Sequence, residues 1–178
     1  MAWDPVGELT AGERKNFARH GQVGERLWLN VPGPFWTGVT DNCWTGRMEA
    51  PDSVLYTAES AHCTEYVFRQ PRNPSEVRAL AEAAWAEPCG EYYCDGDLRW
   101  TPAGVRAWWA GRERVVEHLA EALADFGAGG SAGDADAAAG VREFQGYLAG
   151  GLADDLRAYL FRLEEGRYPE AGERLPRL

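Results

Sequence analysis

Lysine is almost absent from this sequence. Lys15 is the only lysine among 18 basic residues, which stand against 28 acidic residues, so the formal charge at pH 7 is −10. Proteins that bind DNA or RNA neutralise phosphates with lysine and arginine side chains. The composition therefore argues against nucleic acid as the main partner, and it suits a cationic ligand, a basic protein partner or plain solubility.

A long hydrophobic run is also missing. No 18 consecutive residues are apolar, so we expect no membrane-spanning helix. The first residues, MAWDPVGELTAGERKNF, contain no basic segment followed by an apolar one, which predicts that there is no secretory signal. We accordingly expect a cytoplasmic protein with four reduced thiols, at Cys43, Cys63, Cys89 and Cys94.

Motifs for cofactors and metals are lacking as well. The chain has neither a glycine-rich phosphate loop nor a G-x-G-x-x-G fingerprint, so we expect no cofactor. Structural zinc sites usually contain cysteine pairs two residues apart, whereas Cys89 and Cys94 are separated by four residues and His62 directly precedes Cys63. These spacings predict no bound metal ion, and the DGD stretch at 95–97 is typical of a turn and not of a calcium loop.

Strands are predicted in the first half of the chain. Apolar residues alternate with others over 26–31, which is the period of a half-buried strand. The runs 53–58 and 64–70 are rich in β-branched and aromatic residues and predict two further strands. The stretch CWTGRMEAP, residues 43–51, is typical of a turn followed by a strand.

Helix start signals mark the rest of the chain. The capping box TAGE predicts a short helix at 11–20, and Asn73 followed by proline predicts a helix that ends before residue 88. Apolar residues recur every three or four positions over 102–126 and 141–164. These two segments predict long amphipathic helices packed against each other. Two positions on their apolar stripes should be largely buried, Leu119 and Leu156.

Together these elements predict an α+β fold in a single domain, residues 1–178. We expect a small mixed or antiparallel sheet from residues 26–100, covered on one face by a C-terminal pair of long antiparallel helices within 101–165. The low-complexity stretch at 127–137 predicts a mobile loop between these helices, and 166–178 would form a tail.

Aromatic and polar side chains concentrate in the strand-and-turn half. Small-molecule sites are clefts with apolar walls and a few polar groups, although a single aromatic residue in a strand more often belongs to the core. We predict that the loops around 41–44 and 62–65 meet at one aromatic-lined cleft. The predicted acid–base catalytic residues are Asp41, His62 and Glu65. The predicted substrate-binding residues are Trp36, Asn42, Trp44, Arg47, Tyr66 and Arg69.

Cys43 is a candidate nucleophile, and the alternative is a packed thiol beside a turn. The pair Cys43-Trp44 resembles the cysteine regions of papain-like peptidases and transglutaminases, over these two residues. The resemblance implies a thiol at the start of a helix with a histidine base, for which His62 is nearest in sequence. A turn and strand at 43–51 would instead make Cys43 a small packed residue.

Two functional hypotheses follow from these observations. The first is a small cofactor-independent enzyme that acts by acid–base chemistry on a polar or cationic metabolite in the aromatic-lined cleft. The second is an acidic protein-binding module, such as an inhibitor or immunity-type partner of a basic protein. The partners to consider are a small-molecule ligand, a basic protein or a second copy of the chain. A closed pocket favours the first hypothesis and a flat acidic face the second.

Overall fold

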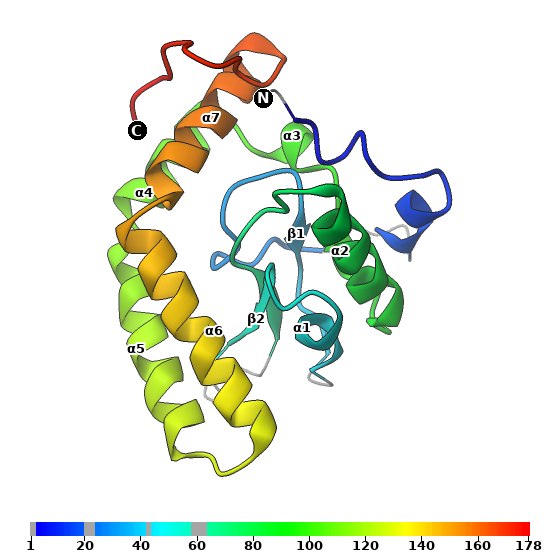
Figure 1. Cartoon of the computed structure of the whole chain (residues 1–178), viewed down its shortest axis with the longest axis vertical. Coiled ribbons are helices and arrows are strands. Elements are labelled where there is room, and N and C mark those ends of the chain that lie inside the picture. Colours follow the sequence, from blue (N-terminus) through cyan, green and yellow to red (C-terminus); the bar gives the residue numbers. More distant parts are fainter. Residues whose placement is uncertain (1–2, 20–23, 42–43, 58–63) are drawn as a thin grey trace.

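The computed structural model describes residues 3–19, 24–41, 44–57 and 64–178, which form an α+β fold. Short strands lie in the middle of the molecule (Figure 1). On one side they are flanked by helices α1 (Thr45–Glu49) and α2 (Pro74–Ala86), and on the other by the C-terminal helices. The predicted fold class is confirmed. Among the described residues, no helix combines the length and apolarity that crossing a membrane requires.

The strands form two small antiparallel sheets. Strand β2 (Val54–Tyr56) pairs with β3 (Glu65–Val67), and strand β1 (Trp36–Thr37) pairs with β4 (Tyr92–Tyr93). The two sheets are joined because the Thr37 hydroxyl donates a 2.7 Å hydrogen bond to the backbone carbonyl of Glu65. This small antiparallel arrangement is one of the two forms that the sequence predicts.

The β2–β3 hairpin is buried on both faces. Leu55 and Tyr66 pack into a core that also contains Leu119 and Leu156 from the C-terminal helices. Their neighbours Val54 and Val67 pack into a second core with α2. Successive side chains of a strand point to opposite faces, so the hairpin separates the two cores.

The C-terminal helices form a hairpin whose two arms are each broken once. The first arm consists of α4 (Pro102–Ala110) and α5 (Glu113–Ala128), and the second of α6 (Ala132–Ala149) and α7 (Leu152–Glu165). Helix α5 packs on α6 and α4 on α7. Leu119 and Leu156 are buried, as the apolar stripes predict. The break in the second arm falls at Gly150, whose backbone is not helical, and glycine is a poor helix former.

The strand predicted at 26–31 is wrong. All of these residues are described, and they form an irregular segment and a turn. The reason lies in the buried side chain of Asn30, which donates to the carbonyls of Leu27 and Thr37 and accepts from the backbone N–H groups of Thr37 and Val67. These side-chain bonds satisfy backbone groups that a strand ladder would otherwise pair.

Three other local predictions also differ from the structure. Within the segment predicted as a helix at 11–20, the described residues 11–19 contain only a short 3-10 helix, Glu13–Asn16, although the predicted capping bonds between Thr10 and Glu13 are present. Residues 45–49 form helix α1 where a turn and strand were expected. The stretch 127–137 is helical from Ala132 onwards, because Ser131 and Asp134 form a capping box that starts α6.

Candidate functional site

The described residues that border the two predicted loops, Thr40 on one side and Thr64 and Glu65 on the other, lie side by side. The backbone N–H of Thr40 donates to the hydroxyl of Thr64, and the backbone N–H of Glu65 donates to the hydroxyl of Thr40, both at 2.8 Å. Asp41, which begins the first predicted loop, and Glu65, which ends the second, therefore lie in the same region. Three other predicted site residues lie outside the described residues, namely Asn42, Cys43 and His62.

The carboxyl group of Glu65 is completely buried in this region. Its Oε1 accepts a 2.6 Å hydrogen bond from the backbone N–H of Gly46, and its Oε2 accepts a 2.6 Å bond from the hydroxyl of Tyr92. Burial outweighs both hydrogen bonds and raises the pKa of Glu65 to about 7, with a smaller contribution from the nearby Asp41 and Glu87. This carboxyl group can therefore hold or release a proton near neutral pH.

Further acidic groups surround Glu65. The backbone N–H of Asp41 donates to the buried carboxylate of Glu87, and Oδ1 of Asp41 is buried without a hydrogen-bond partner. Glu87 also accepts from the backbone N–H groups of Cys89 and Glu91. Lost hydration and the Glu87 carboxylate raise the pKa of the Cys89 thiol to about 11, so this thiol is protonated at neutral pH. Sequence patterns gave no signal for Glu87, which only the end of α2 brings here.

The three aromatic side chains that were predicted to bind substrate pack within the protein instead. Trp36 stacks on Tyr93 with ring centroids 4.0 Å apart and donates from Nε1 to Asp95. Tyr66 is fully buried in the core. Trp44 stacks on Tyr56, whose hydroxyl donates to the Trp44 carbonyl. All three side chains are therefore held by packing within the protein, and Trp36 also by its hydrogen bond to Asp95.

The two predicted arginines link elements of the fold. Arg47 is buried and pairs through Nε with Asp136 at 2.7 Å. Arg69 pairs with Asp52 at 3.3 Å and also lies over the ring of Phe68. Both guanidinium groups are thus engaged with carboxylates of the protein itself.

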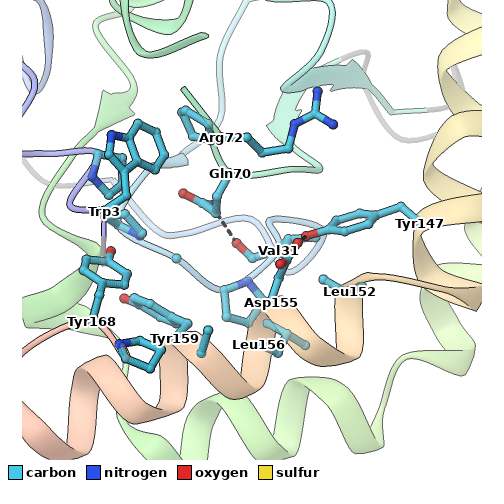
Figure 2. Close-up of a pocket in the computed structure, with 17 residues that line it drawn as sticks. Trp3, Val31, Gln70, Arg72, Tyr147, Leu152, Asp155, Leu156, Tyr159 and Tyr168 are labelled. Carbon is cyan, nitrogen blue, oxygen red and sulfur yellow. Dashed lines mark hydrogen bonds between the residues drawn. The ribbon is translucent and has the colours of Figure 1, made fainter. Parts of the chain in front are cut away.

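The structure contains a cleft elsewhere, between the loop at 31–34, the segment 70–72 and helix α7 (Figure 2). Its volume is about 310 Å³. Figure 2 shows Trp3, Tyr159 and Tyr168 on one side of it and Tyr147 on the other. None of the predicted site residues that the structure describes lines it. The lining includes Trp3, Pro5, Val31, Gln70, Arg72, Tyr147, Leu152, Asp155, Leu156, Tyr159 and Tyr168.

The charges at this cleft do not cancel. Arg72 is paired with Glu76 at 3.0 Å and with Asp52 at 3.6 Å. Asp155 accepts a 2.6 Å hydrogen bond from the hydroxyl of Tyr147, which carries no charge. Asp155 therefore leaves the cleft with a net negative charge, because the positive charge of Arg72 is already balanced.

Phenol groups add polar atoms to the lining, beside the amide of Gln70. The hydroxyl of Tyr159 is buried and interacts with the carboxylate of Asp97. Burial, and then the nearby carboxylate of Asp97, raise the pKa of Tyr159 and of Tyr168 well above the ordinary value. Both phenols are therefore neutral donors in the physiological range. The sequence does not predict this site, because 166–178 is predicted to be a tail and no local pattern marks Trp3 as a site residue.

Neither the grouping of potential metal ligands among the described residues nor comparison with known proteins identifies a further site. In the described parts of the chain, no three histidine, cysteine, aspartate or glutamate side chains are grouped so that they could hold a metal ion. In comparisons with known proteins, no family model matches the chain, and neither a curated protein nor a solved structure matches it.

Proposed function

We propose that this is a cytoplasmic protein that binds a small cationic metabolite in the cleft of Figure 2. The observation that carries the proposal is the combination of aromatic walls with the unbalanced carboxylate of Asp155 in one concave site. Ring faces attract organic cations through the negative charge above the ring, and a nearby carboxylate adds a Coulombic attraction. The charge of −10 on the whole chain favours the approach of a cation.

The size of the cleft supports a small ligand. Its volume of about 310 Å³ lies at the lower end of the range of roughly 300–1,000 Å³ in which proteins bind small molecules. The exposed carboxylate of Asp155 and the aromatic side chains of the lining suit a compact charged group. A small quaternary or primary amine matches these features.

Choline and its neutral carbon isostere, dimethylbutanol, test this proposal because they differ mainly in charge. Isothermal titration calorimetry with the whole chain should detect choline binding and much weaker binding of the isostere. Asp155→Asn should weaken choline binding by about tenfold, as expected for the loss of one charged contact of about 1.4 kcal/mol. Asp154→Asn is the matched control, since Asp154 precedes Asp155 on α7, pairs with Arg157 and does not line the cleft.

Two results would contradict the proposed cation site, and one further variant tests its aromatic wall. Equal affinity for choline and the neutral isostere, or equal effects of Asp155→Asn and Asp154→Asn, would contradict a cation site. Trp3→Ala should weaken both ligands, because it removes an aromatic wall without removing charge.

Acid–base catalysis on a polar metabolite is the second candidate function, and Glu65 is the observation that favours it. A carboxyl group with a pKa of about 7 can act as both proton acceptor and donor near neutral pH. His62 and Asp41 are its proposed partners, on the sequence prediction that their loops converge. Turnover of a metabolite mixture, followed by mass spectrometry, should occur with the wild-type chain and with Glu82→Gln but not with Glu65→Gln. Equal turnover by all three chains would exclude Glu65 as the catalytic residue.

Protein binding is the alternative to both small-molecule functions. The acidic composition supports a basic protein partner, and a second copy of the chain is the other proposed partner. Light scattering at several protein concentrations tests for the second copy. A mass that stays that of one chain at all concentrations would exclude it under those conditions.

A further inference from the structure

A second concave surface lies where the segment before β1 meets the junction of α4 and α5. Its volume is about 420 Å³, and it shares no lining residue with the cleft of Figure 2. The side chains of interest in its lining are Arg26, Trp28, Trp100, Trp108 and Arg114. We call this surface the Arg–Trp cleft. The proposed cation site does not account for it.

Each arginine of the Arg–Trp cleft is stacked on a tryptophan. The guanidinium carbon of Arg26 lies 3.5 Å from the ring centroid of Trp100, and that of Arg114 lies 4.5 Å from the ring centroid of Trp28. Stacking holds a planar guanidinium by its face and leaves the N–H groups along its edge directed away from the ring. Those edges are the part of arginine that forms paired hydrogen bonds with carboxylate and phosphate oxygens.

Neither arginine has a counter-charge in the described parts of the chain. Eight other arginines form ion pairs with aspartate or glutamate there, but the guanidinium groups of Arg26 and Arg114 form neither an ion pair nor a hydrogen bond. Among the described residues, some exposed arginines, such as Arg78, also form no ion pair, whereas Arg26 forms none although it is half-buried. Burial lowers the pKa of Arg26 from its ordinary value, and arginine nevertheless keeps its proton in proteins. The cleft therefore holds two unbalanced positive charges.

The tryptophans add a flat apolar surface beside these charges. Trp28 is 37% exposed, while Trp100 and Trp108 are mostly buried. Trp108 is fixed because its Nε1 donates a 2.9 Å hydrogen bond to the carbonyl of Trp28. The exposed indole of Trp28 contacts His118 edge-on, with ring centroids 5.7 Å apart, and its exposed surface can stack on a planar ring.

We propose that the Arg–Trp cleft binds a small anion that carries a planar ring together with a carboxylate or phosphate group. The ring stacks against the exposed indole of Trp28, and the oxyanion accepts hydrogen bonds from the edges of Arg26 and Arg114. The inference does not depend on the proposed cation site, since the two clefts have no residue in common.

Four probes separate the contributions of charge and ring. Phenyl phosphate and benzoate carry both features with different oxyanions, benzyl alcohol carries only the ring, and inorganic phosphate carries only the charge. Binding to the whole chain is followed by isothermal titration calorimetry and by quenching of tryptophan fluorescence. We expect phenyl phosphate or benzoate to bind at least about tenfold more tightly than benzyl alcohol and inorganic phosphate, because only they use both features.

Arginine variants locate the binding. Arg114→Gln and Arg26→Gln should each weaken the better of the two anions by about tenfold. Arg112→Gln is the matched control, because Arg112 also stacks on an indole, 4.2 Å from the Trp109 centroid, but does not line the cleft. If Arg26→Gln unfolds the chain, Arg114→Gln alone is used for the test. Arg114 is exposed in the first turn of α5, so its substitution should not unfold the protein.

Three results would overturn the proposal. The first is that neither phenyl phosphate nor benzoate binds at millimolar concentration, and the second is that benzyl alcohol binds as tightly as they do. The third is that Arg112→Gln weakens binding as much as Arg114→Gln does. Binding of a glutamate-rich peptide without binding of either ring-bearing anion would also overturn it, and would make the cleft a docking surface for an acidic protein.

Discussion

The guanidinium of Arg47 forms a 2.7 Å ion pair with the carboxylate of Asp136, across 89 positions of sequence. The contact joins α1 to α6, and Arg47 also donates to the carbonyls of Pro51 and Val54. Arg47 is only 4% exposed, whereas the side chain of Asp136 is 59% exposed. A side chain predicted to bind substrate is thus a link between the two halves of the fold.

Asp136→Asn should lower the free energy of unfolding by about 1–2 kcal/mol, because it removes a charged hydrogen-bond acceptor that is partly screened by water. Urea denaturation measures the change. Asp154→Asn is the control, since its pair with Arg157 is exposed and should contribute less than about 1 kcal/mol. Equal losses in the two variants would show that the Arg47–Asp136 pair does not stabilise the contact between α1 and α6.

Gly46→Ala should destabilise the protein. A β-carbon at Gly46 would overlap the hydroxyl of Tyr92 and Oε2 of Glu65, both of which are held in the buried hydrogen-bond network. Relieving such an overlap costs about 1–3 kcal/mol. Gly146→Ala in α6 is the matched control, because its β-carbon would meet no atom. It should raise the free energy of unfolding by about 0.5–1 kcal/mol. Thermal denaturation should therefore move the two midpoints in opposite directions.

Glu65 should make stability fall as pH rises through neutrality. Its pKa is about 7 in the folded protein against an ordinary value of 4.5, so the folded state binds the proton more tightly than the unfolded state does. The stabilising contribution is complete below about pH 4.5 and is lost as pH rises through 7.

Glu65→Gln removes this titration while keeping an amide that can accept and donate hydrogen bonds. Relative to wild type, the variant should gain about 2–3 kcal/mol in free energy of unfolding between pH 5 and pH 8, in urea denaturation at the two pH values. Glu82→Gln, on the exposed face of α2, should show no such change. A pH-independent difference between wild type and Glu65→Gln would contradict a raised pKa at this site.

Leu119→Ala should lower the free energy of unfolding by about 2–5 kcal/mol, because Leu119 is fully buried and the substitution leaves a cavity. Val116 lies on the same helix and belongs to the apolar stripe that the sequence predicts, but it is 49% exposed. Val116→Ala should therefore change stability by less than about 0.5 kcal/mol. Similar losses in both variants would mean that the exposed side of α5 is covered in solution.

Helix α2 illustrates what could be predicted locally. Asn73 accepts from the backbone N–H groups of Ser75 and Glu76, and Pro74 occupies the first turn. Every group in this signal lies within four residues, so no distant contact could alter it. The capping box at Thr10 was equally local and its bonds are present, yet the helix after it is short, because the backbone is already extended at Phe17. Ala18 follows with a positive φ of 51°, which a helix cannot continue through.

In the candidate sites, too, some residues could be predicted from local sequence and others could not. Glu65 was predicted from its place at a strand end, whereas Tyr92 and Gly46, which hold its carboxylate, come from β4 and α1. The cleft of Figure 2 was not predicted, because Trp3 and Tyr168 come from opposite ends of the chain. No local pattern records that these two segments lie together.

The sequence by itself determined the α+β class, helix α2, the helical hairpin and the burial of Leu119 and Leu156, because periodicity and capping act over a few residues. Only the tertiary structure decided that Asn30 replaces a strand, that Arg47 pairs with Asp136 and that the unbalanced charges lie at Asp155, Arg26 and Arg114. The physical reason is that the fold decides which partner a polar group meets, as Asn30 meets Val67 and Arg47 meets Asp136, and which charged groups it leaves without one.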